Sequence, residues 1–475
     1  MTTSGGAVAA IDLGATSGRV LLGYVGHDEL RLTDVARFPN NPVRTLDGLH
    51  WSVLELYRHV VEGLAAASRQ EPQLTSIGID SWAVDYGLLR QDRLLGIPYS
   101  YRDERNEAGV AAVHAIVPPE ELYRRNGLQH LPFNTLFQLT ADKQAGMLEL
   151  ADSFLLLPDL LAHWLTGASV AERTNASTTG LLGVESGEWD LELAEKLGIP
   201  TGIFAALVDA GTEIGGINPT AARGVGASRA VVTAVGSHDT ASAVVAVPAS
   251  GPDHAYISCG TWSLVGVELE RPVLSDAGRA ANFTNEGGVD GRVRYLHNVM
   301  GLWLLTECIR DWERDGTTIS LPALIAEAAA VTGPVPVFDA DDETFLPPGG
   351  MPGRIAAWFA ERGEKAPESR AEMTRSILES LAQAYARAIR TASELSGVDV
   401  KVIHLVGGGS QNELLCRLTA DATGIPVLAG PVEATAIGNV LVQARAQGFV
   451  RGDLEALRAI VARAFPPKRF EPTAG

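Results

Sequence analysis

The amino-acid sequence predicts an α/β protein made of two similar halves. Val8–Gly23 and Ala255–Glu268 each read as an apolar strand, a tight turn of small residues and a second apolar strand. Val402–Leu418 adds another apolar strand, which is followed by three glycines and a helix pattern. Because a single hydrophobic core stops growing at roughly 250–300 residues, a chain of 475 residues should form two or three domains. The repeated pattern predicts a duplicated fold, with domains over residues 1–245 and 246–475.

The composition excludes several classes of partner. The formal net charge of −19 argues against binding to nucleic acid or to an anionic membrane. The three cysteines lie far apart without zinc-ligand spacing, which suits a reducing cytosol. There is no charged-then-apolar leader and no run of about 18 apolar residues, so we expect a cytoplasmic protein without a membrane span. No lysine follows a glycine-rich loop, which excludes a Walker A phosphate site.

The turn of the first repeat carries residues suited to phosphate. Asp12 ends the strand, and Gly14–Gly18 supplies small and hydroxylated residues whose backbone amides can approach phosphate oxygens closely. Asp12 could hold a hydrated Mg²⁺, an ion that keeps several waters and binds one or two carboxylates. The alternative is an ordinary hairpin with an aspartate in its turn. The density of Asp, Gly, Thr, Ser and Arg favours the phosphate interpretation.

Helix and strand patterns then alternate. Trp51–Ser68 is predicted to be an amphipathic helix, and Ser76–Leu89 a strand, a turn and a strand. Asp80 and Asp85 flank Trp82, which indicates either a substrate pocket or turn carboxylates beside a packed indole.

Four further segments complete the first half up to residue 180. Tyr99–Asn106 is predicted to be a loop with a solvated cluster of charges, and whether it reaches a substrate stays open. Asn134–Lys143 and Phe154–Gly167 are predicted to be core helices, the second ending at its glycine. Arg173–Gly180 is predicted to be a polar loop.

The chain is organised around Ala234–Ala246, where a turn of small residues leads into His238, Asp239, Thr240 and a helix pattern. Asp239 stands where the helix begins, so one interpretation makes it an N-cap or first-turn carboxylate. The other makes it a carboxylate at the floor of a cleft that takes a proton from a substrate hydroxyl. The phosphate-like turns before and after it in the sequence favour the second interpretation.

The second half repeats the design. Thr261 lies in the turn of Ala255–Glu268 and would supply a hydroxyl to phosphates. In Tyr295–Trp312, Asn298 precedes an apolar helix, either as its N-cap or as a carboxamide that points into a cleft. Met373–Leu395 is predicted to be an amphipathic scaffold helix.

The three glycines of Val402–Leu418 would let a nucleotide lie on the backbone, with Asn412 in the first turn of the next helix. A dinucleotide fingerprint would need glycine at this asparagine and a later acidic residue, so dinucleotide binding is not expected. Gly430–Asn439 is predicted to form a loop and a small-residue helix packed under the glycine loop.

In this order the segments resemble the FGGY family of carbohydrate kinases over nearly the whole chain. The motifs that carry the resemblance are IDLGATSGR, IDSWAVD, FNTLFQL, GSHDTASA, CGTWS, NVMGLWLL, GGGSQN and GPVEATAIGN. The resemblance implies two ribonuclease H/actin-like ATPase domains flanking a deep cleft, with ATP and Mg²⁺ used to phosphorylate a small-molecule sugar. It implies a monomer or small homo-oligomer. An actin- or chaperone-like ATPase is the alternative from another class.

The resemblance also implies roles for single residues. Asp239 matches the proton acceptor and Asp12 the Mg²⁺ ligand. The positions implied for the sugar are Ala83, His238, Asp239, Thr240 and Asn298. Those implied for ATP are Ala15, Thr16, Ser17, Gly18, Arg19, Thr261, Thr306, Gly408 and Asn412. Two positions depart from the family pattern: Ala83 replaces a glycine and narrows the sugar pocket by one methyl, and Thr306 replaces a glutamine that contacts the nucleotide.

Overall fold

The computed structural model describes residues 5–26, 29–220, 222–226, 229–314 and 316–473. The chain divides into two compact units that interleave along the sequence. The first unit comprises Met1–Ser250, Glu268–Tyr295 and Ala434–Ala464, and the second comprises Gly251–Val267, Leu296–Glu433 and Phe465–Gly475. The boundary expected between residues 245 and 246 stays a prediction.

The first unit is built on a six-stranded mixed sheet. Its strands are β1 (Gly6–Leu13), β2 (Ser17–Val25), β3 (Leu30–Pro39), β6 (Ser76–Ser81), β12 (Glu213–Gly216) and β13 (Val231–Thr233), in the spatial order β12-β13-β6-β1-β2-β3. The hairpin β1–β2 is antiparallel, whereas β6 runs parallel to both β1 and β13. The carboxyl ends of β1, β6 and β13 therefore meet at one edge of the sheet.

Small sheets and helices complete this unit. The other strands are β4 (Val43–Arg44), β5 (Leu49–His50), β7 (Tyr86–Arg90), β8 (Arg93–Leu94), β9 (Ser153–Leu156), β10 (Val170–Glu172), β11 (Ala206–Val208) and β16 (Thr284–Gly287). The helices are α1 (Val53–Gln70), α2 (Asn106–His114), α3 (Pro119–Asn126), α4 (Thr135–Gln144), α5 (Leu157–Thr166), α6 (Arg173–Ala176), α7 (Leu191–Leu197), α8 (Asp239–Val245), α9 (Asp276–Ala280), α15 (Ala434–Ala446) and α16 (Leu454–Ala464).

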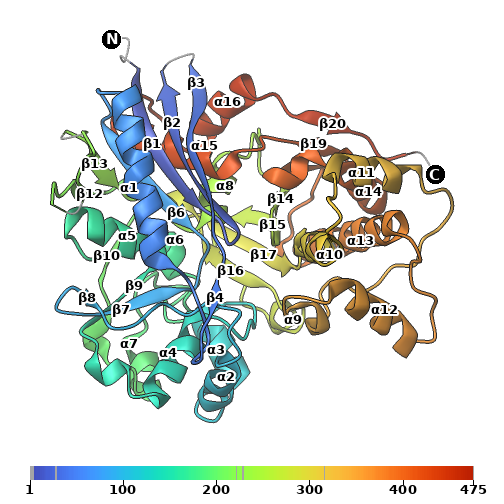
Figure 1. Cartoon of the computed structure of the whole chain (residues 1–475), viewed down its shortest axis with the longest axis horizontal. Coiled ribbons are helices and arrows are strands. Elements are labelled where there is room, and N and C mark those ends of the chain that lie inside the picture. The colour runs from blue at the N-terminus through green and yellow to red at the C-terminus, as the bar shows by residue number, and fades with distance from the viewer. Residues whose placement is uncertain (1–4, 27–28, 221, 227–228, 315, 474–475) are drawn as a thin grey trace. The chain divides into compact units, whose positions relative to one another are not determined.

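Helices from opposite ends of the chain cover the first sheet. The blue helix α1 lies along it in Figure 1, and a side chain on Gly63 of α1 would strike Val20 of β2. The red helix α15 also packs on it, because a side chain on Gly23 of β2 would strike Val440. The first sheet is therefore covered by two helices, α1 and α15, that lie far apart in the sequence.

The second unit contains the main part of a seven-stranded sheet in the order β16-β17-β15-β14-β18-β19-β20. Its strands are β14 (His254–Cys259), β15 (Ser263–Leu269), β17 (Val293–Val299), β18 (Val402–Val406), β19 (Val427–Ala429) and β20 (Lys468–Phe470), of which β15 and β17 extend into the first unit. Its helices are α10 (Trp303–Glu313), α11 (Leu321–Ala330), α12 (Met351–Glu361), α13 (Arg370–Ser396) and α14 (Glu413–Thr423).

The duplication predicted from the sequence is confirmed. In the first sheet, β1 pairs antiparallel with β2 and parallel with β6. In the second, β14 pairs antiparallel with β15 and parallel with β18. The scaffold helix is also confirmed as α13, which begins with a capping box of Ser369 and Glu372 and buries Ile377, Leu381 and Tyr385.

One helix prediction and one loop prediction need correction. The run that begins at Phe154 starts as strand β9, and α5 begins only at Leu157 with Pro158 in its first turn. An apolar run of this kind fits a buried strand or a buried helix equally well, so the proline is the better marker of the helix start. The polar stretch after Arg173 likewise begins as a short helix, α6, because Glu172 caps it.

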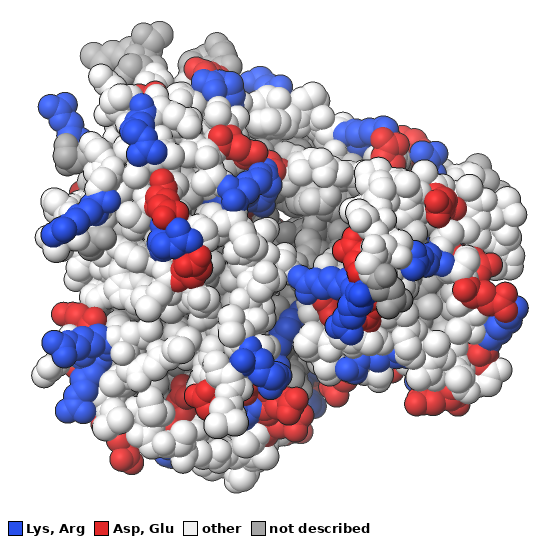
Figure 2. All heavy atoms as spheres, in the orientation of Figure 1, with Lys and Arg blue, Asp and Glu red and all other residues white. Residues whose placement is uncertain are grey.

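The surface mixes charges of both signs. Figure 2 shows Lys and Arg interspersed with Asp and Glu over one face, with neither sign gathered into a broad patch. No helix in the described part of the chain has the length and apolar character needed to cross a membrane.

The packing of α15 on α8 predicts a strong effect of one added methyl. A side chain on Gly438 of α15 would lie 1.8 Å from the carbonyl oxygen of Ser242 in α8. We expect Gly438→Ala to lower the free energy of unfolding by about 1–3 kcal/mol through overpacking. Gly353 in α12 is the matched control, because nothing lies within 4 Å of its missing side chain. Gly353→Ala should raise stability by up to about 1 kcal/mol. Thermal unfolding of both variants checks this, and equal midpoints would contradict it.

Candidate active site

Three acidic groups meet at the carboxyl edge of the first sheet. Asp12 near the end of β1 is the register partner of Asp80 in β6. The segment after β13 continues beside β6. There Ser81 N donates to Ser237 O at 2.9 Å, and Ser81 forms an isolated parallel β-bridge with His238. This pairing brings Asp239, the first residue of α8, to the same edge.

The two strand carboxylates have different partners. Arg19 of β2 contacts one oxygen of Asp12 through Nε at 2.9 Å and Nη2 at 2.8 Å. Asn439 of α15 donates to Asp80 Oδ2 at 2.6 Å, whereas the buried Oδ1 of Asp80 has no hydrogen-bond partner in the part of the chain that the structure describes. Burial raises the pKa of Asp80 well above its usual value, and the charge of Asp12 adds to the rise.

Asp239 presents one carboxylate oxygen that other groups leave open. Its Oδ1 accepts hydrogen bonds from Thr240 N at 2.6 Å and Thr240 Oγ1 at 3.2 Å, and lies 3.5 Å from His238 Nε2. Among the residues that the structure describes, none donates to Oδ2. The side chain is 29% exposed, and burial of its surroundings raises the pKa of Asp239. His238 occupies the N-cap of α8 and Asp239 lies in its first turn, so the N-cap position predicted for Asp239 is wrong and the first-turn position is confirmed.

A buried set of charges lies behind His238. Arg294 of β17 donates from Nη2 to His238 Nδ1 at 3.0 Å and from Nε to Gly287 O at 2.9 Å. Glu286 of β16 places Oε2 3.2 Å from Arg294 Nη1 and 3.3 Å from His238 Nδ1. All three side chains are buried.

Glu172, at the end of β10, fixes the turn that leads into α8. Its carboxylate accepts hydrogen bonds from Ser237 N and Oγ at 3.0 and 2.9 Å, and from Thr174 N, Thr174 Oγ1 and Asn175 N. Asp159 of α5 lies behind it. Among the described residues, this carboxylate accepts only from Glu172 N, at 3.3 Å, and its buried Oδ2 has no partner. Burial raises the pKa of both carboxyls.

The first predicted phosphate loop is the turn between β1 and β2. Gly14 N donates to Ser17 O at 2.8 Å, and Asn40 holds the turn by donating to Gly14 O and Thr16 O. No acceptor among the described residues takes the amides of Ala15 and Thr16. The backbone forms the hairpin that the alternative interpretation predicted. Within this hairpin the amides of Ala15 and Thr16 remain available as donors.

The turn after β6 is strained. Asp85 N donates to Ala83 O at 2.9 Å across Val84, whose φ of 68° is rare for a β-branched residue. Asp85 Oδ2 holds the turn by accepting from Trp51 Nε1 at 2.5 Å and Trp82 Nε1 at 2.9 Å. Burial raises the pKa of Asp85 to about 6. The Asp85 carboxylate holds the indoles of Trp51 and Trp82 by hydrogen bonds. Of its two interpretations, the turn carboxylate beside a packed indole is therefore correct.

The solvated charge cluster predicted for Tyr99–Asn106 is wrong. Asp103 is buried and accepts from Leu49 N at 2.6 Å, and Arg105 forms a largely buried ion pair with Asp142 of α4. A run of alternating charges gives no sign of such partners, because they lie far away in the sequence.

In the second unit, Thr261 lies in the turn between β14 and β15. Gly260 N donates to Trp262 O at 2.8 Å, and the carbonyl of Thr261 accepts from Trp303 N at 3.0 Å. The Thr261 hydroxyl has no partner among the described residues. Gly301, at φ 64°, makes this packing possible, since a side chain there would lie 2.6 Å from Thr261 O.

The glycine loop after β18 has one open position. Gly407 adopts φ 83°, and a side chain on Gly409 would lie 2.2 Å from Cys259 Sγ. Gly408 between them has nothing within 4 Å of the missing side chain. Asn412 is the N-cap of α14, accepting from Leu415 N at 3.1 Å, which corrects its predicted place in the first turn.

Three other predictions concern positions in or near this unit. Asn298 lies within β17, so its interpretation as an N-cap is wrong, and Leu302 precedes α10. Thr306 lies in α10. The small-residue helix α15 packs on α8 and β1 of the first unit, and the contact to the glycine loop is made by Pro431, whose carbonyl accepts from Gly407 N at 3.0 Å.

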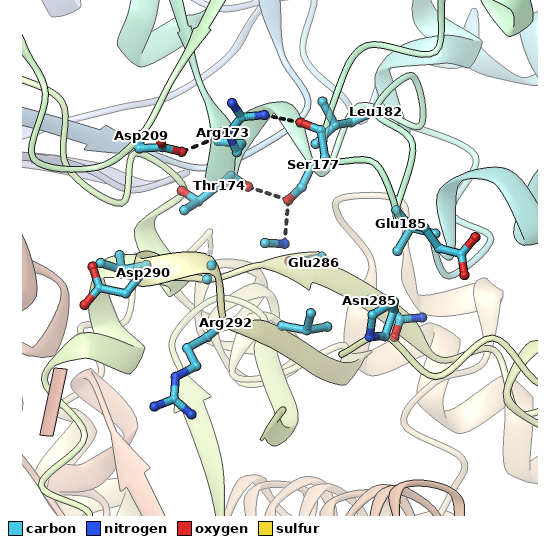
Figure 3. A pocket seen from close by; sticks show the side chains of 18 of the residues that line it. Arg173, Thr174, Ser177, Leu182, Glu185, Asp209, Asn285, Glu286, Asp290 and Arg292 are labelled. Carbon is cyan, nitrogen blue, oxygen red and sulfur yellow. Dashed lines mark hydrogen bonds and ion pairs between the residues drawn. The ribbon is translucent and has the colours of Figure 1, made fainter. Parts of the chain in front are cut away.

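A cavity of about 850 Å³ lies within the first unit, between the α6 segment and the β16–β17 turn. Figure 3 shows Ser177 and Thr174 on one side and Glu286 and Arg292 on the other. Gly287 N donates to Ser177 Oγ at 2.8 Å across the gap. Because Glu286 lines this cavity, the cavity borders the residues that hold His238.

The first unit thus brings Asp12, Arg19, His238, Asp239 and Thr240 into one region. The sequence analysis missed Glu172, Glu286, Arg294 and Asn439. The sequence did hold a signal for Glu286 and Arg294. Each is a charged residue within a strand pattern, one before and one after the Gly287-Gly288 pair. Among the described residues, no group of three or more His, Cys, Asp and Glu is arranged to hold a metal ion.

The duplicated sheets and the acidic edge define a two-domain α/β kinase fold. Residues 7–246 match the N-terminal domain of the FGGY family of carbohydrate kinases, and residues 255–447 match its C-terminal domain. The chain belongs to this family and is an ATP-dependent carbohydrate kinase.

Full-length relatives share one name. A rhamnulokinase of Bacteroides thetaiotaomicron is 40% identical over 466 residues, which cover 98% of this chain and 95% of the relative. A rhamnulokinase of Pectobacterium carotovorum is 43% identical, over 98% of this chain and 93% of the relative.

Solved structures support the fold. A gluconate kinase from Lactobacillus acidophilus matches with a TM-score of 0.79 at 16% identity, over 99% of this chain and 94% of that chain. A glycerol kinase from Plasmodium falciparum, with ADP, matches with a TM-score of 0.77 at 12% identity, over 98% of this chain and 94% of that chain.

The two buried carboxyls below the site predict opposite responses to amide substitution. The raised pKa of Asp159 means that the folded state favours its neutral form, so its ionisation lowers stability as pH rises above 3.8. The stability of Asp159→Asn relative to the native chain should therefore increase from pH 4.5 to pH 7.5. Glu172→Gln should lose about 1–3 kcal/mol, because its new amide group would face Thr174 N.

Chemical unfolding of both variants at the two pH values measures these changes. A gain for Asp159→Asn that is the same at both pH values would show that this carboxyl ionises in the folded protein as readily as in the unfolded chain.

Proposed function

We propose that this enzyme transfers the γ-phosphoryl group of ATP to the 1-hydroxyl of L-rhamnulose, giving L-rhamnulose 1-phosphate and ADP in L-rhamnose breakdown. The full-length relatives named rhamnulokinase support the substrate. The observation that carries the chemistry is Asp239, whose open Oδ2 stands at the start of α8 while donors hold Oδ1.

In the proposed mechanism Asp239 acts as general base. As the sugar oxygen attacks the γ-phosphorus, its proton passes to Asp239 Oδ2, and the bond between the γ-phosphorus and the bridging oxygen of ADP breaks. Phosphoryl transfer has a loose transition state, so the protein mainly positions the reactants and neutralises charge. Proton transfer to a positioned base contributes roughly 10²–10⁴ in rate.

We assign phosphate contacts to both hairpin turns. The amides of Ala15 and Thr16 and the loop through Ser17, Gly18 and Arg19 would bind phosphate oxygens. The hydroxyl of Thr261 would do the same from the turn of the second hairpin. The assignment is supported by the amides of Ala15 and Thr16 and the hydroxyl of Thr261, which have no acceptor or partner among the described residues.

A bound Mg²⁺ would be held by Asp12, with Asp80 Oδ1 as a second oxygen. The buried, unpartnered Oδ1 beside Asp12 fits such an ion, which needs only one or two carboxylates besides water and phosphate oxygens. When bound, the ion neutralises the charge of the β- and γ-phosphates.

The remaining assignments follow the family motifs. His238, Thr240, Asn298 and the strained turn at Ala83 would contact the sugar. The nucleotide would rest on Gly408, with Asn412 and Thr306 beside it. The open position at Gly408 supports this placement of the nucleotide.

We further propose that the enzyme acts in the cytoplasm as a monomer or small homo-oligomer, on sugar and ATP, without nucleic acid or membrane as a partner. The three cysteines support a reducing compartment, because all are buried as free thiols. The methyl of Ala83 is the observation that favours a second candidate, a kinase for another sugar such as L-fuculose, xylulose or glycerol.

The first test is ADP release from ATP and Mg²⁺ with L-rhamnulose, beside a panel of other sugars. We expect sugar-dependent turnover that falls by about 10² or more in Asp239→Asn, because the amide cannot accept the proton. Asp34→Asn on the exposed face of β3 is the control and should keep native turnover.

Faster turnover on another ketose would replace L-rhamnulose as the substrate. Turnover without any sugar would favour the actin- or chaperone-like ATPase. If Asp239→Asn turned over nearly as fast as the native enzyme, Asp239 would not be the general base.

The pH dependence tests the base separately. Asp239 must be ionised to accept a proton, so kcat/KM should fall tenfold per pH unit on the acid side of its pKa. Because burial raises that pKa, the midpoint of the fall should lie above pH 3.8. The residual activity of Asp239→Asn should lack this fall, and an acid limb retained in the variant would assign it to another group.

A further inference from the structure

We propose that Arg294 is a positioning residue that fixes the tautomer of His238 and, through it, the orientation of the Asp239 carboxylate. This inference rests on the proposed role of Asp239 as the base. It concerns a residue of β17 that lies outside the quoted family motifs and carries no role in the proposed mechanism.

The guanidinium of Arg294 can only donate. It is fully buried, at 0% exposure, and its nitrogens face His238 Nδ1 at 3.0 Å, Gly287 O at 2.9 Å and Glu286 Oε2 at 3.2 Å. An arginine side chain has five N–H donors and no acceptor. His238 Nδ1 must therefore accept from Arg294, which leaves the ring proton of the neutral imidazole on Nε2.

This proton is on the ring nitrogen nearest to the proposed base. Nε2 lies 3.5 Å from Asp239 Oδ1, the same oxygen that Thr240 N and Thr240 Oγ1 contact at 2.6 and 3.2 Å. Among the described residues, both hydrogen bonds to this carboxylate thus come from Thr240 and fall on Oδ1, and the Nε2 proton adds an electrostatic attraction to the same oxygen. Oδ2 is then the oxygen left to receive the sugar proton.

Glu286 makes this arrangement depend on Arg294. Its Oε2 lies 3.3 Å from His238 Nδ1 and would accept a hydrogen bond from that nitrogen if the nitrogen carried the ring proton. Without the guanidinium, the ring proton would move to Nδ1 and pair with Glu286. The lone pair of Nε2 would then face Asp239 Oδ1, and two acceptors would repel each other. The charged groups around the ring are Asp239 from α8, Glu286 from β16 and Arg294 from β17.

The direct test is ¹⁵N NMR of the histidine ring nitrogens at pH 8, with His238→Gln identifying the signals of His238. In the native protein we expect Nε2 to carry the proton and Nδ1 to be unprotonated. In Arg294→Met we expect the reverse. Glu286→Gln is the matched control and should keep the native tautomer, because Arg294 remains.

Kinetics supply the second readout. Arg294→Met should lower kcat by about 10- to 100-fold through misplacement of the base, with little change in the KM for ATP. Arg294→Lys retains a donor at this place, so it should keep the native tautomer and recover much of the rate.

A proton on Nδ1 in the native protein would overturn the proposal even if Arg294→Met fails to fold. So would an unchanged tautomer in a folded Arg294→Met. These NMR results do not depend on activity. Failure of the base itself would instead appear as native turnover in Asp239→Asn, with the tautomer of His238 unchanged.

Discussion

The parallel register of β1 and β6 places two buried carboxylates, Asp12 and Asp80, side by side. Two such charges in a medium of low dielectric are costly unless cations or donors compensate for them. Arg19 reaches Asp12 from the second strand of the hairpin, and Asn439 reaches Asp80 from α15. The hairpin, the central strand and a helix from the end of the chain are therefore all needed to hold one acidic edge. In the proposed function, a Mg²⁺ ion at this edge would add positive charge beside the two carboxylates.

The buried acids of this unit differ in what surrounds them, and this separates their roles. Glu172 receives five donors and fixes the turn before α8, whereas Asp85 gathers two indoles and stabilises the strained turn at Val84. Asp239 differs from both, because its donors crowd onto one oxygen only. A carboxylate held from one side keeps both a fixed orientation and a free acceptor, which is the combination that a general base requires.

The sequence predicted the features that local pattern determines. Strand alternation and small-residue turns identified both hairpins, and the helix start after His238 located Asp239. Contacts between distant segments could not be found this way. Glu286 and Arg294 meet His238 only after the sheet forms, and the pairing of Arg105 with Asp142 turned an apparently solvated charge cluster into a buried one. The helix start predicted at Phe154 was wrong for another reason. Periodicity alone does not separate a buried strand from a buried helix.

The return of α15 and α16 to the first unit has a consequence for biosynthesis. A ribosome releases the first sheet and α8 long before it releases residues 434–464. Until then, α15 does not cover the surface of α8 that packs on Gly438 or the part of β2 that packs on Val440. Asp80 also lacks its hydrogen bond from Asn439. The second unit receives strand β20 after that point. The acidic edge is thus completed only when Asn439 has been made, 359 residues after Asp80.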